Sequence, residues 1–127
     1  MHDTSRATVA IVEDDESVRE AIEGWINVVG FRAKPFALAL DFLASPDIAD
    51  IACLVADINM PAMTGIELHR RLADLGYAIP TILITAFPDE SVRARALADG
   101  VTCYLVKPFD DEDLLRCIRL AIGDPSG

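Results

Sequence analysis

The sequence predicts an α/β fold in which a five-stranded parallel sheet is covered by helices on both faces. Short apolar runs alternate about five times with segments of helical periodicity, and the connections between them are short. The run at 51–57 is apolar up to a final aspartate, which is typical of a strand buried on both faces. In such a sheet, with right-handed crossovers, the carboxyl ends of all strands lie along one edge.

The composition predicts one domain in a reducing compartment. The chain has 127 residues, of which 52% are hydrophobic, enough to bury a core. Its net charge of −10 argues against direct contact with nucleic acid or an anionic membrane. The three cysteines lack paired spacing, so we interpret them as buried, inert thiols without a redox role.

The domain organisation follows from the ends of the apolar pattern. We expect a disordered N-terminus at 1–6, one folded domain at 7–122 and a C-terminal tail at 123–127. No apolar segment reaches the roughly 18 to 20 residues of a membrane span, and the N-terminus lacks the apolar core of a signal peptide. We therefore expect a cytoplasmic protein that does not associate with membranes.

Two strands and two helices are predicted in the first part of the chain. They are, in order, a strand at 7–12, a helix at 17–29, a strand at 31–36 and a short helix at 38–44. Gly30 is expected to end the first helix, where Trp25 has the spacing of a core residue. Pro35 cannot donate a main-chain hydrogen bond, which predicts an edge strand.

Three more strands and three more helices complete the pattern. The strands are expected at 51–57, 79–84 and 101–106, and the helices at 64–75, from Pro88 to about Asp99, and at 110–122. Thr64 and Glu67 have the spacing of a capping box, and Pro88 is expected in a first helical turn. Leu75 is assigned to the apolar side of its helix, and His69 is interpreted as a solvated side chain.

Polar residues suited to phosphoryl chemistry follow four of the predicted strands. Glu13 and Asp14 follow the first strand, Asp57 ends the third, and Thr85 and Lys107 come after the fourth and fifth. Adjacent strands lie about 4.8 Å apart, so Asp14 and Asp57 would approach each other if the first and third strands are neighbours. The sequence therefore predicts an acidic cluster at the carboxyl edge of the sheet.

An acidic cluster of this kind requires cations. Two are available: a divalent metal, for which oxygen ligands favour Mg²⁺, and the Lys107 ammonium. A carboxylate beside Mg²⁺ can act as a nucleophile toward phosphorus, and Asp57 is the candidate. Thr85 and Lys107 are suited to bind the phosphoryl oxygens. Each residue alone has an ordinary structural explanation; their joint occurrence at four strand ends favours phosphoryl transfer.

These strand ends carry motifs of a known family. The motifs are Ile11-Val-Glu-Asp-Asp-Glu16, Asp57-x-x-Met-Pro-x-Met-x-Gly65, Ile84-Thr-Ala86 and Lys107-Pro-Phe109. Over roughly residues 7–122 the chain resembles the receiver domains of two-component response regulators. The segment Phe87-Pro-Asp-Glu90 and the last helix resemble the nitrogen-fixation-regulator branch more loosely.

The resemblance implies a flavodoxin-like fold with strand order 2-1-3-4-5. It implies that Asp57 is the phosphoacceptor and that Asp14, Asp57 and the main-chain carbonyl of Asn59 bind Mg²⁺. Glu13 would complete the acidic pocket through a water molecule. Asp15 comes one position too late for a role to be assigned.

The resemblance also implies a switch and its partners. Thr85 would be the switch hydroxyl, Lys107 would face the phosphate, and a cis peptide would precede Pro108. Tyr104, which alone is more typical of simple packing, would turn inward and change the surface formed by the helix that follows Pro88, the strand at 101–106 and the helix at 110–122. A sensor histidine kinase would be the donor, and an output domain or downstream protein the target, with a phosphorylation-dependent homodimer as a further possibility. The chain would catalyse only its own phosphorylation and dephosphorylation.

Two other functions and two local hypotheses accompany this interpretation. A haloacid-dehalogenase-type phosphatase would need a second aspartate where Asn59 stands, and a phosphorylation-independent interaction module would be expected to lack part of the site. We hypothesise that Phe87 hinders attack by water on the phosphorylated state, and that Pro88 stiffens the entry to the helix that ends near Asp99. The sequence leaves open the kinase, the stimulus, the oligomeric state, the phosphorylated lifetime and whether an output domain belongs to the protein.

Overall fold

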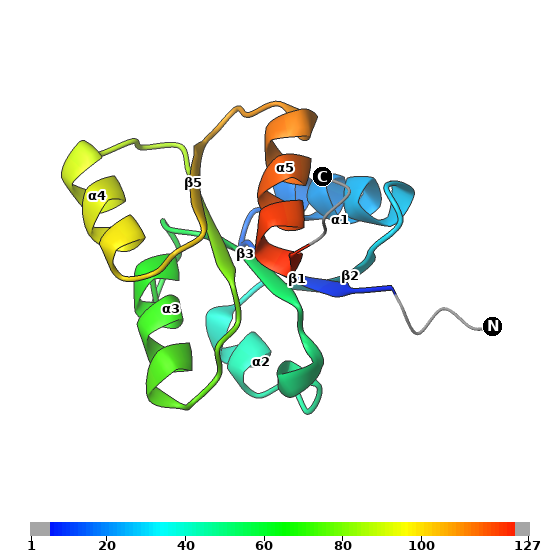
Figure 1. Cartoon of the computed structure of the whole chain (residues 1–127), viewed down its shortest axis with the longest axis horizontal. Coiled ribbons are helices and arrows are strands. Elements are labelled where there is room, and N and C mark those ends of the chain that lie inside the picture. Colours follow the sequence, from blue (N-terminus) through cyan, green and yellow to red (C-terminus); the bar gives the residue numbers. More distant parts are fainter. Residues whose placement is uncertain (1–5, 124–127) are drawn as a thin grey trace.

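The computed structural model describes residues 6–123 as a parallel sheet between two layers of helices (Figure 1). The strands are β1 (Thr8–Val12), β2 (Arg32–Phe36), β3 (Cys53–Asp57), β4 (Thr81–Thr85) and β5 (Cys103–Val106). The helices are α1 (Glu16–Val28), α2 (Ala39–Leu43), α3 (Gly65–Asp74), α4 (Glu90–Ala98) and α5 (Asp111–Ile122), with a 3₁₀ turn at Ile48–Asp50. The strand order is β2-β1-β3-β4-β5, which confirms the predicted topology.

The central strands are buried because both sheet faces are covered. All residues of β3 and β4 are buried, as the continuous apolar run predicted. Along β3, Cys53 and Val55 pack with α1 and α5, whereas Leu54 and Ala56 pack with α2, α3 and α4. The strand containing Pro35 lies at the sheet edge, as expected.

Side-chain caps set where three helices begin. Asp15, to which the sequence assigned no role, accepts a hydrogen bond from the Val18 N–H at 3.1 Å and caps α1. Thr64 and Glu67 form the predicted capping box of α3. Pro88 was wrongly expected in the first turn of α4; Asp89 is the N-cap, because its extended backbone and side-chain oxygen satisfy the first N–H groups of the helix.

The burial of Leu75, His69 and Cys103 differs from what the sequence predicted. Leu75 is 53% exposed because it is the C-cap of α3, where the helical face turns away from the core. His69 is half-buried, and burial lowers its pKa. Cys103 is likewise half-buried, whereas Cys53 and Cys117 are buried, and burial raises the pKa of each to about 12.

The predicted ends of the domain fall mostly outside residues 6–123. Arg6, at the border of the expected disordered N-terminus, donates hydrogen bonds to the carbonyls of Gly30 and Phe31. Gly123 ends α5 in the left-handed conformation, and 124–127 lie beyond the described residues. Within the described range, every helix is too short or too polar to cross a bilayer.

Candidate functional site

Three carboxylates meet at the carboxyl edge of the sheet, as predicted. Glu13 and Asp14 directly follow β1, and Asp57 is the last residue of β3, which pairs with β1. One oxygen from each of the three side chains lies within 4.8 Å of the others. Glu13 and Asp57 are buried, whereas Asp14 is exposed, so the cluster opens to solvent on the Asp14 side.

Lys107 reaches this cluster from β5, two strands away from β3. Its main-chain N–H donates to the Thr85 carbonyl at 2.7 Å, which continues the pairing of β4 and β5. Its Nζ lies 2.9 Å from Glu13 Oε1 and 3.3 Å from Asp57 Oδ2. Burial alone would lower the pKa of Lys107, but the hydrogen bond and charge of Glu13, together with the charge of Asp57, outweigh burial and raise it.

The acidic cluster retains unbalanced negative charge. Burial raises the pKa of Glu13; hydrogen bonds from the Asp15 N–H and Lys107 act against this, and the charge of Asp57 adds to it. A single ammonium cannot neutralise three carboxylates. Clustered oxygen donors with one exposed member are the arrangement that Mg²⁺ prefers, because this ion keeps several of its water ligands. The residues therefore fit a magnesium site.

Thr85 lies beside Asp57 because β3 and β4 are neighbours. Its hydroxyl donates a hydrogen bond to Asn59 Oδ1 at 2.7 Å and accepts one from the Phe87 N–H at 2.9 Å. The Asn59 N–H in turn donates to Asp57 Oδ1 at 3.1 Å. The sequence assigned Asn59 a role only through its carbonyl; nothing in the local pattern indicated that its amide contacts Thr85.

The remaining predicted residues lie around this centre. Tyr104 is half-buried and its hydroxyl accepts a hydrogen bond from the Asp89 N–H at 3.1 Å, which connects β5 to the start of α4. Phe87 is 71% exposed. The peptide bond between Lys107 and Pro108 is cis, as the resemblance implied.

Two residues support the site in ways that the sequence did not reveal. A Cβ atom on Gly65, the first residue of α3, would lie 2.6 Å from the carbonyl oxygen of Asp57. Arg19 of α1 donates a hydrogen bond to the Glu13 carbonyl at 2.8 Å. The glycine in the motif after Asp57 was the available signal for the first contact; no pattern signalled the second.

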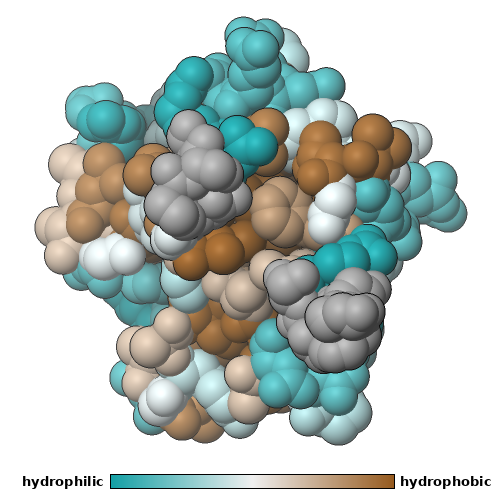
Figure 2. Space-filling view, turned by 45° about the vertical axis from the view of Figure 1, so that its right-hand side comes forward, coloured by the Kyte–Doolittle hydropathy of each residue, from teal (hydrophilic) through white to brown (hydrophobic). Residues whose placement is uncertain are grey.

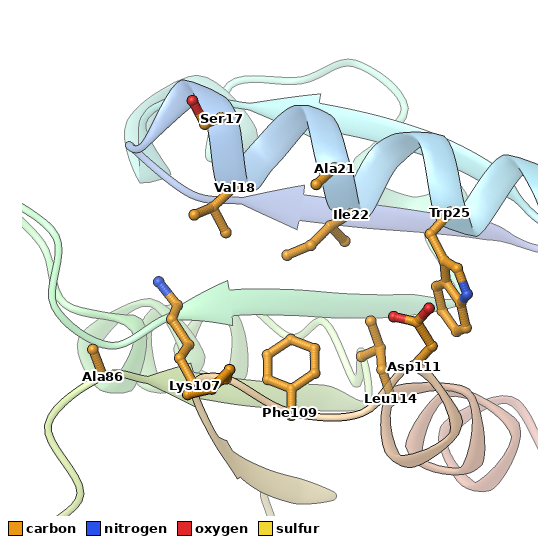
Figure 3. A pocket seen from close by; sticks show the side chains of 11 residues that line it. Ser17, Val18, Ala21, Ile22, Trp25, Ala86, Lys107, Phe109, Asp111 and Leu114 are labelled. Atoms are coloured by element: carbon orange, nitrogen blue, oxygen red, sulfur yellow. The ribbon is translucent and has the colours of Figure 1, made fainter.

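An apolar pocket of about 650 Å³ adjoins the site (Figure 3). Ile22 and Trp25 of α1 form one wall, and Phe109 and Leu114 form the opposite wall. Lys107 lies at the end of the pocket nearest the acidic cluster. Trp25 was interpreted as a core residue but is only half-buried, and it lines this pocket.

A doubly wound sheet with three acidic residues, a hydroxyl and a lysine at its carboxyl edge defines the receiver class of signalling domain. The family model described as "Response regulator receiver domain" matches residues 9–119. The chain belongs to this family, and is thus a receiver domain of two-component response regulators.

Relatives and solved structures agree with this assignment. The chain is 37% identical over 116 residues to the response regulator protein TmoT of Ectopseudomonas mendocina, covering 91% of this chain and 53% of that protein. It is 38% identical over 115 residues to the transcriptional regulatory protein FixJ of Rhizobium meliloti (strain 1021), covering 90% of this chain and 56% of FixJ. The crystal structure of FixJ-N superposes with a TM-score of 0.84 at 37% identity, covering 98% of this chain and 97% of that one. The chain thus spans about half the length of the curated relatives it matches.

Proposed function

We propose that Asp57 accepts a phosphoryl group from a phosphohistidine of a sensor histidine kinase. The observation that carries this proposal is the contact of the buried Asp57 with the Lys107 ammonium, at the centre of the carboxylate cluster and beside the Thr85 hydroxyl. Asp57 is 5% exposed, yet the cluster opens to solvent at Asp14, so a donor can approach from that side.

A magnesium ion would be held by the carboxylates of Asp14 and Asp57 and by the main-chain carbonyl of Asn59. Glu13 would contribute through a water molecule, since the Lys107 ammonium already occupies one of its oxygens. Bound Mg²⁺ would offset the negative charge of the transferring phosphoryl group.

In the proposed phosphoryl transfer, the residues of this chain have separate roles. A carboxylate oxygen of Asp57 attacks phosphorus; the new O–P bond forms as the N–P bond of the donor breaks, and the departing imidazole keeps the electron pair and takes up a proton. The Lys107 ammonium then pairs with a phosphoryl oxygen, while Glu13 keeps it in place. Later attack by water restores Asp57, so the only reactions catalysed are phosphorylation and dephosphorylation of the chain itself.

Phosphorylation would be transmitted through Thr85 to the surface formed by α4, β5 and α5. Thr85 turns its hydroxyl toward the phosphoryl group, and Tyr104, whose hydroxyl contacts the start of α4, turns inward. An output domain or a downstream protein recognises the changed surface, and a phosphorylation-dependent homodimer through it is a further expectation. FixJ bears the name of a transcriptional regulatory protein, which is consistent with an output of that kind.

Intact mass spectrometry tests the proposed phosphorylation. The protein is incubated with acetyl phosphate in the presence and absence of Mg²⁺, with the Asp57→Asn variant in parallel. We expect a gain of one phosphoryl group that requires Mg²⁺ and is lost in the variant. The same gain in Asp57→Asn would refute Asp57 as the acceptor. No gain from acetyl phosphate or from phosphorylated kinases would favour a phosphorylation-independent module.

A further inference from the structure

We propose that the side chain of Asn59 is a latch that holds the Thr85 hydroxyl away from Asp57 until a phosphoryl group competes for it. This inference rests on the proposed function of Asp57 and Thr85. It assigns a positioning role to the amide of Asn59, separate from the metal-binding role expected of its main-chain carbonyl. The hydrogen bond from Thr85 Oγ1 to Asn59 Oδ1, at 2.7 Å, carries the proposal.

The hydroxyl of Thr85 can donate only one hydrogen bond. Its proton is directed to Asn59, and its oxygen accepts from the Phe87 N–H at 2.9 Å. To donate to a phosphoryl oxygen on Asp57, the hydroxyl must release Asn59. The contact with Asn59 is therefore in direct competition with the contact that defines the phosphorylated state.

The backbone holds the latch in position. The Ile58 N–H donates to the Ile84 carbonyl at 2.9 Å, so β3 and β4 remain paired beyond Asp57. The Asn59 N–H donates to Asp57 Oδ1 at 3.1 Å. These two bonds fix the Asn59 main chain beside Thr85, and only the exposed amide is left to move.

Burial makes Asn59 the partner on which the Thr85 hydroxyl depends. Thr85 is 1% exposed, so bulk water has little access to replace a lost acceptor. A phosphoryl oxygen carries more charge than an amide oxygen and accepts a stronger hydrogen bond. The phosphoryl group can thus displace the latch, whereas in the unphosphorylated protein Thr85 stays with Asn59.

The Asn59→Ala variant tests the latch while keeping the main-chain carbonyl. With Mg²⁺ in excess, its affinity for beryllofluoride, a phosphoryl mimic that binds aspartate, is measured by calorimetry beside that of the unmodified protein. We expect roughly twofold to tenfold tighter binding. This factor corresponds to the net free energy of one neutral hydrogen bond.

A double-mutant cycle separates a latch from a general effect on the site. In the Thr85→Val background, which removes the hydroxyl at nearly constant shape, Asn59→Ala should leave beryllofluoride affinity unchanged. A gain of the same size in both backgrounds would overturn the proposal, because Asn59 would then act independently of the hydroxyl. Unchanged affinity of Asn59→Ala in the Thr85 background would overturn it as well.

The rotamer of Thr85 provides a readout that needs no ligand. Three-bond couplings from the Thr85 methyl carbon report its χ1 angle in the unphosphorylated protein, where we expect one rotamer with Asn59 and a shifted or averaged value in Asn59→Ala. An unchanged χ1 would refute the latch. If the unmodified protein failed to bind beryllofluoride, the proposed role of Asp57 would be in doubt, while these couplings would still decide the question of the latch.

Discussion

Lys107 compensates only part of the charge on its two buried partners. Its ammonium lies 2.9 Å from Glu13 and 3.3 Å from Asp57, yet the pKa of Glu13 remains raised because burial outweighs the lysine. Three clustered carboxylates with a single ammonium favour an added cation. At the scale of single residues, the site is thus prepared for a metal before any phosphoryl group arrives.

Phe87 offers a test of how the phosphorylated state is protected. Its side chain is 71% exposed, while its main-chain N–H is held by the Thr85 hydroxyl. We predict that Phe87→Ala speeds dephosphorylation severalfold, because a bulky apolar group no longer hinders attack by water. Loss of the phosphorylated mass over time measures the rate.

A matched control for Phe87→Ala is Val28→Ala. Val28 is 82% exposed and is the last residue of α1, whose first turn is the end near the acidic cluster. The Val28→Ala substitution therefore truncates an exposed apolar side chain that is remote from Thr85. Its dephosphorylation rate should equal that of the unmodified protein. An unchanged or slower rate in Phe87→Ala would contradict the protective role.

At the scale of elements, the close contact between the start of α3 and the end of β3 positions Asp57. A Cβ atom on Gly65 would lie 2.6 Å from the Asp57 carbonyl oxygen and 3.0 Å from Leu83. We predict that Gly65→Ala lowers the free energy of unfolding by about 1–3 kcal/mol, as for overpacking, and slows phosphorylation by displacing Asp57. Urea unfolding and the acetyl phosphate reaction measure the two effects.

The same substitution at Gly24 serves as the comparison. Gly24 lies in α1 with open space around its Cα, so alanine meets no neighbouring atom. Gly24→Ala should raise the free energy of unfolding by roughly 0.5–1 kcal/mol, because alanine favours the helix. If Gly65→Ala and Gly24→Ala changed the free energy of unfolding alike, the close contact between Gly65 and Asp57 would not explain the effect of the Gly65 substitution.

Helix α4 is the element whose packing best suits a response to phosphorylation. Ala96 is its only buried residue, and its first N–H groups are satisfied by Asp89, which itself donates to the Tyr104 hydroxyl. A helix with so little buried surface can shift at low cost. Movement of Tyr104 would break its hydrogen bond at the start of α4. Through the loss of this contact, a change at Thr85 would reach the proposed output surface.

At the scale of the whole molecule, folding brings like charges together at one sheet edge. Figure 2 shows several separate groups of hydrophobic residues among hydrophilic ones on one face of the molecule. The overall charge of the chain is −10. The carboxylate cluster forms only when β1 and β3 pair, so Mg²⁺ that binds there stabilises the folded state.

We therefore predict that Mg²⁺ raises the free energy of unfolding. At 100 times its dissociation constant the gain should be about 2.7 kcal/mol, measured by urea unfolding. Asp14→Asn should largely abolish the gain and, without Mg²⁺, be at least as stable as the unmodified protein, because one of three repelling charges is removed. Asp74→Asn, at the opposite end of α3 from Gly65, should keep the full gain; an equal gain in Asp14→Asn would place the metal elsewhere.

Much of the fold and of the site was predictable because it depends on local chemistry. The edge strand followed from Pro35, the start of α3 from the spacing of Thr64 and Glu67, and the buried β3 from its apolar run. The start of α4 was missed, since Pro88 and Asp89 both suit a helix N-terminus and only the hydrogen bonds distinguish them. The family motifs identified the polar strand ends that the structure brings together.

The sequence by itself determined the order of the elements, the edge strand and the residue types at each strand end, because these depend on neighbours along the chain. Only the tertiary structure decided which of these side chains meet. Lys107 contacts Glu13 across 94 positions, and Thr85 contacts Asn59 across 26. Such contacts depend on strand register and on the direction of each side chain, which arise when the sheet assembles and which no local pattern contains.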